Sequence, residues 1–240
     1  MTINFISDLH LNPDEPATTE AFLGFLAGAA READALWILG DLFEYWAGDD
    51  DLASPFNAGI AGALRELVSS GVTTKLIVGN RDFLLGKTFS QETGVDIVSE
   101  PIRLMLGDRQ CVLLHGDALC TDDVAYQQFR LMVRNPAWQA KFLAQPLAVR
   151  HQIAADLRAK SEMSKQGKAL EIMDVNADAV TRAFRDSGAS LMIHGHTHRP
   201  AMHKLAVDGG TSQRYVLPDW HGHACGIQWD GKALRNFGSR

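Results

Sequence analysis

The sequence predicts an α/β layered fold with one helical insertion. Short apolar runs recur along its 240 residues, and each run ends in polar residues. Helix-like stretches lie between several of these runs, and one long stretch contains no strand signal. Strands that alternate with helices are typical of α/β architectures. An apolar content of 46% and a charged content of 22% are ordinary for a folded soluble protein.

The first half of the chain alternates strand and helix signals. A first strand is predicted in "INFIS", which runs into "DLH", and helix-like sequence follows at 18–32. The next apolar run, "ALWIL", ends in "GD", and a second helix-like stretch covers 57–70. A third run, "KLIV", ends in "GNRD". Because ligands collect outside the carboxyl ends of strands in open α/β sheets, these three loops are expected to share one site.

Two later strands also end in polar residues. They are predicted in "CVLL", which ends in "HGD", and in "SLMI", which ends in "HGHTH". His194, His196 and His198 alternate there, and positions two apart share one side of an extended segment. Imidazole is the commonest metal ligand and the usual general acid or base. The alternative is a His-rich surface loop, but five strands that each deliver Asp, Asn or His favour one site built from five loops.

The predicted insertion covers residues 124–168. It divides the core into a first part, residues 1–123, and a second part, residues 169–240. The insertion contains eight basic and two acidic residues, a net charge of +6, whereas the remainder carries −12. A basic amphipathic insertion in an acidic protein favours a cap that faces something anionic and apolar. The alternatives are a solvated pair of helices, or apolar helix faces that pack on the core.

Composition and charge exclude several classes of function. The formal net charge of −6 disfavours nucleic acid as a partner. Cys111, Cys120 and Cys225 form no CxxC pair, which indicates a reducing compartment and buried small side chains. No apolar run approaches a membrane span, and the first residues lack the flanks of a signal peptide. We therefore expect a cytoplasmic protein.

The polar residues at the strand ends form a plausible ligand set for two metal ions. Seven side chains offer oxygen or nitrogen donors: Asp8, His10, Asp41, Asn80, His115, His196 and His198. Such donors suit Mn²⁺, Fe²⁺ or Zn²⁺, and the absence of thiolate argues against a closed structural zinc site. Two ions about 3.5–4 Å apart can share one carboxylate and activate a water near neutral pH. If Asp41 is shared, each ion has four protein contacts, and in-line attack on phosphorus is the expected reaction.

The order D-x-H, GD, GN(R)D, HGD and GH-x-H resembles the calcineurin-like metallophosphoesterases. The resemblance implies a layered β-sandwich flanked by helices. It also implies one metal held by Asp8, His10, Asp41 and His198. A second metal would be held by Asp41, Asn80, His115 and His196. His194 has no ligand role by this resemblance, and we interpret it as a supporting or structural residue.

Arg81 departs from the wider family pattern GNH[DE], in which the histidine can protonate the leaving group. Arginine cannot give up a proton, but it can hold a phosphate through two hydrogen bonds. A phosphate leaving group, with a second pKa of about 6, needs little protonation. Arg81 therefore favours cleavage of a pyrophosphate bond over an alkyl phosphate ester. The alternative is that Arg81 only pairs with Asp82.

Longer strings narrow the resemblance. "FISDLHL", "ILGDLFEYWAGDDD", "GNRDFLLGK", "LLHGDALCTDDVAYQQFR", "EIMDVN" and "HGHTHRPAMH" resemble the UDP-2,3-diacylglucosamine hydrolases of bacterial lipid A synthesis, over residues 3–204 and again in "VLPDWH". The resemblance implies a pyrophosphatase with two Mn²⁺ ions per chain that releases UMP and 2,3-diacylglucosamine 1-phosphate. It implies a peripheral protein on the cytoplasmic face of the inner membrane. Its partners would be the lipid nucleotide and an anionic membrane surface, with no nucleic acid and no known protein partner.

The same resemblance implies substrate contacts at seven positions: Asn80, Arg81, Asp123, Ser161, Lys165, Lys168 and His196. Catalytic roles would fall on Asp41, Asn80, Arg81 and His196. Lys165 stands where one branch of the family has Asn, although an amine could still donate to the substrate. Asp123 also suits a helix N-cap, while Ser161 and Lys168 also suit ordinary exposed positions.

Two other functions remain open from the sequence. One is a dinuclear-metal phosphodiesterase or phosphatase for a soluble nucleotide, which would have no use for an apolar cap. The other is a metallophosphoesterase-like scaffold that binds partners without turnover. The intact ligand set argues against a scaffold, because such a protein has no need for seven ligands.

Overall fold

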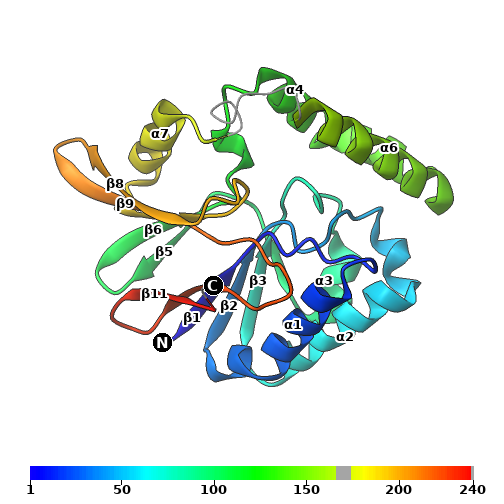
Figure 1. Ribbon diagram of the computed structural model, residues 1–240, viewed down its shortest axis with the longest axis horizontal. Helices are drawn as coiled ribbons and strands as arrows, with labels where there is room; N and C mark the ends of the chain where they lie inside the picture. The colour runs from blue at the N-terminus through cyan, green and yellow to red at the C-terminus, as the bar shows by residue number, and fades with distance from the viewer. Residues whose placement is uncertain (166–173, 239–240) are drawn as a thin grey trace.

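Two β-sheets lie face to face at the centre of the computed structural model, which describes residues 1–165 and 174–238, without the side chains of 160–165 (Figure 1). The first sheet has the order β11-β10-β1-β2-β3-β4. Its strands are β1 Ile3–Ile6, β2 Ala35–Leu39, β3 Thr73–Ile77, β4 Asp96–Val98, β10 Gly226–Trp229 and β11 Leu234–Phe237. The second sheet has the order β5-β6-β7-β9-β8. Its strands are β5 Ile102–Leu106, β6 Arg109–Leu113, β7 Leu191–His194, β8 Ala201–Val207 and β9 Gly210–Val216.

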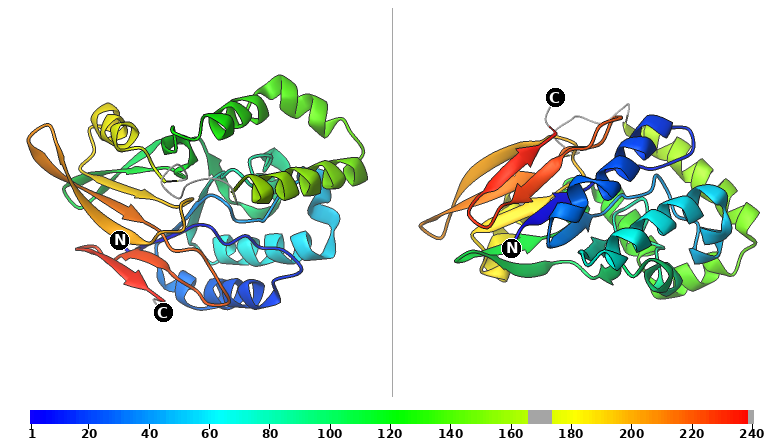
Figure 2. Two further views of the ribbon diagram at one scale, coloured as in Figure 1. Left: turned by 45° about the horizontal axis from the view of Figure 1, so that its top comes forward. Right: turned by 90° about the horizontal axis from the view of Figure 1, so that it is seen from below.

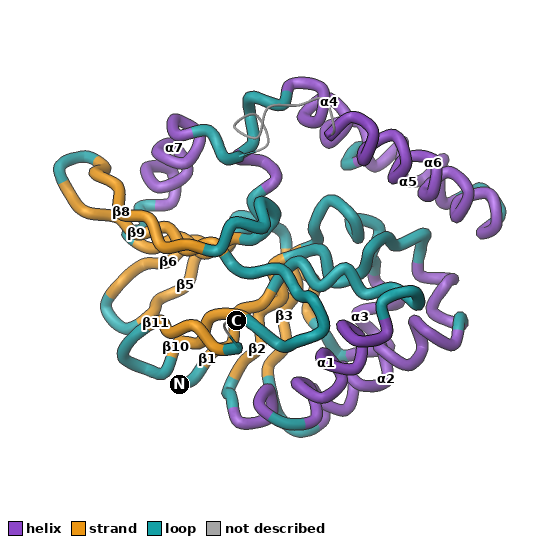
Figure 3. The backbone as a smooth tube through the Cα atoms, viewed as in Figure 1, coloured by secondary structure: helices purple, strands orange, loops and turns teal. Residues whose placement is uncertain are grey.

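Helices cover the outer face of each sheet (Figure 3). Helices α1 Pro16–Ala27, α2 Pro55–Ser69 and α3 Lys87–Thr93 pack on the first sheet, and α7 Ala177–Ser187 packs on the second. Apolar side chains of both sheets, among them Phe5, Leu39 and Ile193, fill the layer between them. The expected layered α/β architecture is therefore confirmed.

The strand order gathers the polar loops at one edge. Strands β1, β2 and β3 are parallel neighbours, so their carboxyl ends lie side by side. Strands β6 and β7 are likewise parallel in the second sheet. Each of these five strands is followed by one of the five polar motifs, and the two sheets bring all five loops to the same end of the sandwich.

The helix expected at 18–32 is shorter in the structure. Helix α1 begins with Pro16 and ends at Ala27, where Gly28 leaves the helical conformation, and a 3-10 turn, Ala29–Glu32, follows. The helix expected at 57–70 is α2, which also begins at a proline. Proline suits the first turn because that turn needs no donor from its backbone nitrogen.

The described part of the insertion is helical. It consists of α4 Val124–Val133, α5 Pro136–Leu143 and α6 Leu147–Lys165. Figure 2 shows these helices, in green, beyond one end of the two sheets. Phe142 is buried in the core between the first sheet and its helices, and Trp138 and Ile153 pack against that core.

Every helix in the described ranges is too short or too polar to cross a bilayer.

Candidate metal centre

Two clusters of metal-binding side chains lie at the edge where the five loops meet. One consists of Asp8, His10 and His198, and the other of Asp41, His115 and His196. Within each cluster the donor atoms lie within 4.8 Å of one another. The seventh expected ligand, Asn80, places its Oδ1 2.9 Å from Nε2 of His115. The structure therefore brings all seven expected side chains together.

Asp41 belongs to the second cluster and also lies close to the first. Its Oδ2 is 3.8 Å from Nε2 of His10, and its Oδ1 is 3.7 Å from Nε2 of His115. Only 2% of Asp41 is exposed, so its two oxygens are directed into the clusters rather than into solvent. This is the geometry that a carboxylate shared between two ions requires.

The backbone at these positions adopts an unusual conformation. Asp8, His10, Asp41, His196 and His198 all have φ between 50° and 68°. Side chains other than glycine rarely adopt this region, and such outliers concentrate at functional sites. Among the described residues Asp208, in the turn between β8 and β9, is the remaining non-glycine example. The strain therefore marks the candidate centre.

Glycines in the motifs make room for the carboxylates. A Cβ atom on Gly79 would collide with Oδ1 of Asp41, and one on Gly195 would collide with Oδ2 of Asp8. Both carboxylates also anchor the neighbouring loops, since Asp41 Oδ1 accepts from the backbone N–H of Arg81 at 2.9 Å. Asp8 accepts from the backbone N–H of His196. Glycine is therefore needed before Asn80 and before His196, because any side chain there would collide with Asp41 or Asp8.

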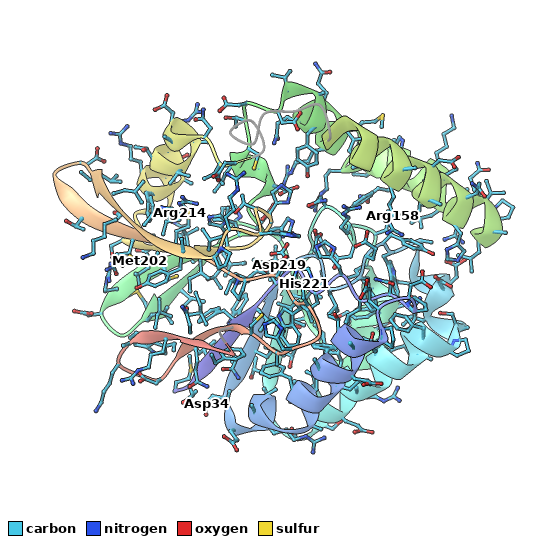
Figure 4. The ribbon with its side chains drawn as sticks, in the orientation of Figure 1. Asp34, Arg158, Met202, Arg214, Asp219 and His221 are labelled. Carbon is cyan, nitrogen blue, oxygen red and sulfur yellow. The ribbon has the colours of Figure 1, made fainter. Side chains whose placement is uncertain are left out.

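Two acidic residues outside the expected set hold the histidines. Glu44 Oε2 lies 2.8 Å from Nδ1 of His10, and Asp219 Oδ2 lies 3.2 Å from Nδ1 of His198. Asp219 also contacts Nε2 of His221 at 2.6 Å, and Figure 4 labels this pair on the segment after β9. With Nδ1 of each ring held by a carboxylate, Nε2 of His10 and Nε2 of His198 face each other, 3.3 Å apart.

His115 and His198 favour the charged form in this environment. Burial lowers the pKa of His198, but Asp219 and Asp8 outweigh it and raise the pKa to about 10. Burial likewise opposes ionisation of His115, yet Asp41, Asp117 and Asp8 raise its pKa to about 9. A metal ion at Nε2 of either ring would replace that proton, because imidazole binds metal in its neutral form.

His196 differs from these two histidines. Burial, and then His115, lower its pKa to about 4, so the ring is neutral at physiological pH. The ring of Tyr126, from α4, lies over it with centroids 5.9 Å apart. The Tyr126 hydroxyl donates to Asp117 Oδ2 at 2.7 Å, and Arg130 Nε donates to the same oxygen at 2.8 Å. The insertion is thereby joined to the loop that carries His115.

Arg81 lies beside the centre on the GNRD loop. Its Nη1 is 3.5 Å from Glu44 Oε1, and Arg158 of α6, labelled in Figure 4, places Nε 2.9 Å from the same oxygen. Asp82 is completely buried and accepts from the backbone N–H groups of Leu42 and Gly79. Both oxygens of Asp82 therefore brace the two loops, and the Arg81 guanidinium is directed to Glu44.

His194 lies outside both clusters. It is fully buried, its Nδ1 is 2.8 Å from the carbonyl oxygen of Gly195, and its Nε2 is 3.0 Å from Nη1 of Arg214. Burial, and then the charge of Arg214, lower its pKa to about 3. The ring is therefore neutral, with Nδ1–H donating and Nε2 accepting.

The expected substrate contacts in the insertion are placed only in part. Asp123 is the N-cap of α4 and accepts from the backbone N–H of Tyr126 at 3.1 Å. Ser161 and Lys165 belong to the last turns of α6, where side chains are not described. Lys168 lies outside the described residues. The N-cap expected as an alternative for Asp123 is thus present.

The basic charge of the insertion is directed in large part to the core. Arg130 contacts Asp117 and Glu100, and Arg134 donates to the carbonyl oxygen of Gly79. Arg150 contacts Asp50 and the carbonyl oxygen of Ala47, and Arg158 contacts Glu44. Four of the eight basic residues therefore hold the insertion in place. The net charge of +6 is in this respect a complement to the acidic core.

The insertion also exposes apolar side chains. Five of its large apolar residues are at least 40% exposed: Val124, Leu131, Met132, Leu143 and Val149. Leu131 is the most exposed of them, at 72%. They are distributed over α4, α5 and α6, which together offer apolar surface for contact with a ligand, a partner or a membrane.

Comparisons with known proteins agree with this geometry. The family model for calcineurin-like phosphoesterases matches residues 1–200. A protein of Aromatoleum aromaticum named UDP-2,3-diacylglucosamine hydrolase is 51% identical over 244 residues, covering 100% of this chain and 99% of that protein. Proteins of the same name from Klebsiella pneumoniae and Cellvibrio japonicus are 50% and 48% identical. They cover 92% and 99% of this chain, and the same shares of their own lengths.

Proposed function

This chain belongs to the calcineurin-like phosphoesterase family, and from that premise we propose that it hydrolyses the pyrophosphate bond of UDP-2,3-diacylglucosamine. The products would be UMP and 2,3-diacylglucosamine 1-phosphate, an intermediate of lipid A synthesis. The observation that carries the proposal is the identity of about half of all residues to proteins of that name, over nearly the whole of both chains.

The donor set fits two divalent cations, and we assign them to Mn²⁺. Carboxylate, amide and imidazole donors suit Mn²⁺, and the described clusters contain no thiolate. The first cation would be held by Asp8, His10, Asp41 and His198, and the second by Asp41, Asn80, His115 and His196. When bound, the pair supplies an activated water and neutralises charge on the phosphate oxygens.

The residues around the cations would orient the pyrophosphate. On substrate binding, Arg81 would give up its contact with Glu44 and donate two hydrogen bonds to phosphate oxygens. Asn80 would help to align the same phosphate. His196, held in place by the Tyr126 ring, would stabilise charge on the attacked phosphate. Attack at the phosphorus on the uridine side releases the lipid phosphate, which needs no general acid.

The cap, residues 124–168, would receive the acyl chains and face an anionic membrane. Its exposed apolar residues provide surface for a lipid, and core residues 1–123 and 169–240 provide the chemistry. Asp123, Ser161, Lys165 and Lys168 would contact the substrate at the junction. The protein would then act as a peripheral protein on the cytoplasmic face of the inner membrane.

The decisive test is UMP release from UDP-2,3-diacylglucosamine in detergent micelles. Metal-stripped protein would be assayed with and without Mn²⁺, beside UDP-glucose and an aryl phosphodiester as soluble comparators. Rapid Mn²⁺-dependent release from the lipid nucleotide alone is expected. Cleavage of the soluble compounds alone would reject the lipid substrate while keeping the phosphoesterase chemistry, and full activity without metal would reject the dinuclear mechanism.

A further inference from the structure

A cavity of about 250 Å³ lies behind the loop that carries His196 and His198. Its polar lining consists of Asp174, Thr197, Arg199, His203 and Arg214. His203 and Arg214 are opposite each other on β8 and β9, so both come from the edge of the second sheet. Figure 4 labels Arg214 there, near the face that α7 covers.

Arg214 has no acidic partner in the part of the chain that the structure describes. It is only 8% exposed, and its Nη1 contacts Nε2 of the neutral ring of His194 at 3.0 Å. Its Nε is buried, with no hydrogen-bond acceptor among the described residues. Burial lowers the pKa of Arg214, and the charge of Asp174 opposes this only in part, so the buried cation is unfavourable.

The neighbouring groups do not balance this charge. The carboxylate of Asp174 is committed to Arg199, with Oδ2 2.7 Å from Nη1 of that residue. The hydroxyl of Thr197 is buried, with no hydrogen-bond partner among the described residues. Burial and then the charge of Arg214 lower the pKa of His203, which favours its neutral form, and an imidazole carries no negative charge in either form. Among the described residues Asp174 is the one carboxylate that lines the cavity, and it forms an ion pair with Arg199.

We propose that this cavity is a binding site for a small oxyanion of the phosphate type, separate from the metal centre. The anion would accept from Nε of Arg214 and from the hydroxyl of Thr197, which are the two buried donors of the cavity lining that have no partner among the described residues. Guanidinium groups bind phosphate oxygens through paired, charge-assisted hydrogen bonds, which suits Arg214 to this role. Because Thr197 lies between His196 and His198, an anion here would also brace the loop that carries both ligands.

The test uses the full-length, Mn²⁺-loaded protein and inorganic phosphate as the probe. Besides phosphate binding at the metal centre, titration calorimetry should find a second class of site in wild type, and Arg214→Met should weaken only this second class, at least tenfold. Thr197→Val, which keeps the charge, should weaken the same class to a smaller extent. Arg185→Gln removes an exposed arginine that pairs with Asp208, and it should bind phosphate as wild type does.

Thermal melting separates binding from folding. The melting temperature of Arg214→Met in phosphate-free buffer is the baseline, because loss of the donor to His194 opposes the gain from removing a buried charge. Added phosphate should raise the melting temperature of wild type more than that of Arg214→Met. Repeating the titrations with UMP identifies the source of the anion. An Arg214-dependent response to UMP indicates a product phosphate, and a response to inorganic phosphate alone indicates the free ion. Equal binding of both probes by wild type and Arg214→Met would overturn the proposal.

Discussion

Two carboxylates, each beside one histidine, determine which ring nitrogen of that histidine faces the candidate metal centre. Glu44 and Asp219 occupy Nδ1 of His10 and His198, so Nε2 of each ring faces the cluster. The carbonyl oxygen of Leu39 does the same for His115, at 2.8 Å from Nδ1. Such partners fix the tautomer and raise the basicity of a ligand.

Glu44→Gln should weaken Mn²⁺ binding by about 10–100-fold, the range typical for loss of a residue that orients a ligand. The amide lacks the charge that stabilises His10 and holds Arg81 and Arg158. Titration calorimetry with Mn²⁺ measures the change. Glu66→Gln is the matched control, because Glu66 is exposed and lies 3.7 Å from Arg31, away from the centre. Equal affinities in all three proteins would remove Glu44 from the metal site.

Loading with metal should release protons. At pH 7 the pKa values of about 10 for His198 and about 9 for His115 leave both rings protonated in the metal-free protein. His196, with a pKa of about 4, has no such proton to lose. About two protons should therefore leave per loaded chain at pH 7, and Mn²⁺ affinity should rise from pH 7 to 9. Calorimetry in buffers of different ionisation enthalpy counts the protons, and a count of zero would contradict the assignment.

Arg81→Ala should lower kcat while Mn²⁺ content stays that of wild type. The guanidinium contacts Glu44, which belongs to neither cluster, so its loss removes a phosphate donor and leaves the expected metal ligands in place. A loss of about 100-fold is reasonable for one preorganised charged donor. Elemental analysis beside steady-state kinetics makes the distinction. Parallel loss of metal would instead make Arg81 a support for the metal site.

The side chains that meet in the two clusters were predictable from sequence, and the carboxylates behind the histidines were not. Asp8, His10 and Asp41 directly follow recognisable strands, and parallel strands carry such residues to one edge. Glu44 and Asp219 are unremarkable in sequence, since an acidic residue on a loop is ordinarily solvated. Their roles depend on which loop crosses behind which histidine, and that is set only by tertiary packing. The positive φ of the ligands likewise has no signal in the residue types.

At the scale of elements, the helices of the insertion are attached to the core by hydrogen bonds and ion pairs of arginines and by packing of aromatic rings. Arg150 is 3% exposed and bonds to Ala47 and Asp50, while Trp138 contacts Phe83 with ring centroids 6.3 Å apart. Tyr45 and His151 add a contact of 3.1 Å. The position of α5 and α6 is therefore determined by the loops after β2 and β3, which also carry Asp41 and Asn80.

Arg150→Met should destabilise the protein by about 1–3 kcal/mol, because it leaves the carbonyl oxygen of Ala47 without its donor. The apolar part of the side chain is retained, so the loss reports on the hydrogen bonds. Urea unfolding measures the difference. Arg182→Met, on the exposed side of α7, should leave stability within about 0.5 kcal/mol of wild type. Equal stability of the two variants would show that the contacts of Arg150 do not stabilise the attachment of the insertion to the core.

Elements with a clear apolar run or a long helical pattern were predictable, and short edge elements were not. The strands before the five motifs and the helical character of 124–165 agree with the sequence patterns. Strands β8 and β11 gave no clear expectation, because each lies at the edge of its sheet and consists of exposed and half-buried residues with no buried face. The three residues of β4 are likewise too few for a periodic pattern.

At the scale of the whole molecule, the candidate metal centre joins the two sheets. Asp8, His10 and Asp41 follow strands of the first sheet, whereas His115, His196 and His198 follow strands of the second. Each cluster in the described structure draws on both. Cations at this seam would therefore stabilise the contact between the halves of the sandwich, in addition to any role in chemistry.

Chelation of the metal should lower the melting temperature by about 5–10 °C. A ligand present at about 100 times its Kd stabilises the native state by about 2.7 kcal/mol. For a domain of this size each kcal/mol corresponds to about 2–4 °C. Differential scanning calorimetry before and after chelation measures the shift. Asp41→Asn, which weakens the shared ligand, should show a smaller shift, and equal shifts would argue against a role for Asp41 in binding metal.

The order of the ligands along the chain has a consequence for biosynthesis. His196 and Asp8 stand 188 positions apart, and both clusters wait for the loop that carries His196 and His198. A ribosome that has translated three quarters of the message has therefore produced neither complete cluster. If these clusters bind cations, the cations would be captured only after that loop has been made, late in the life of the newborn polypeptide.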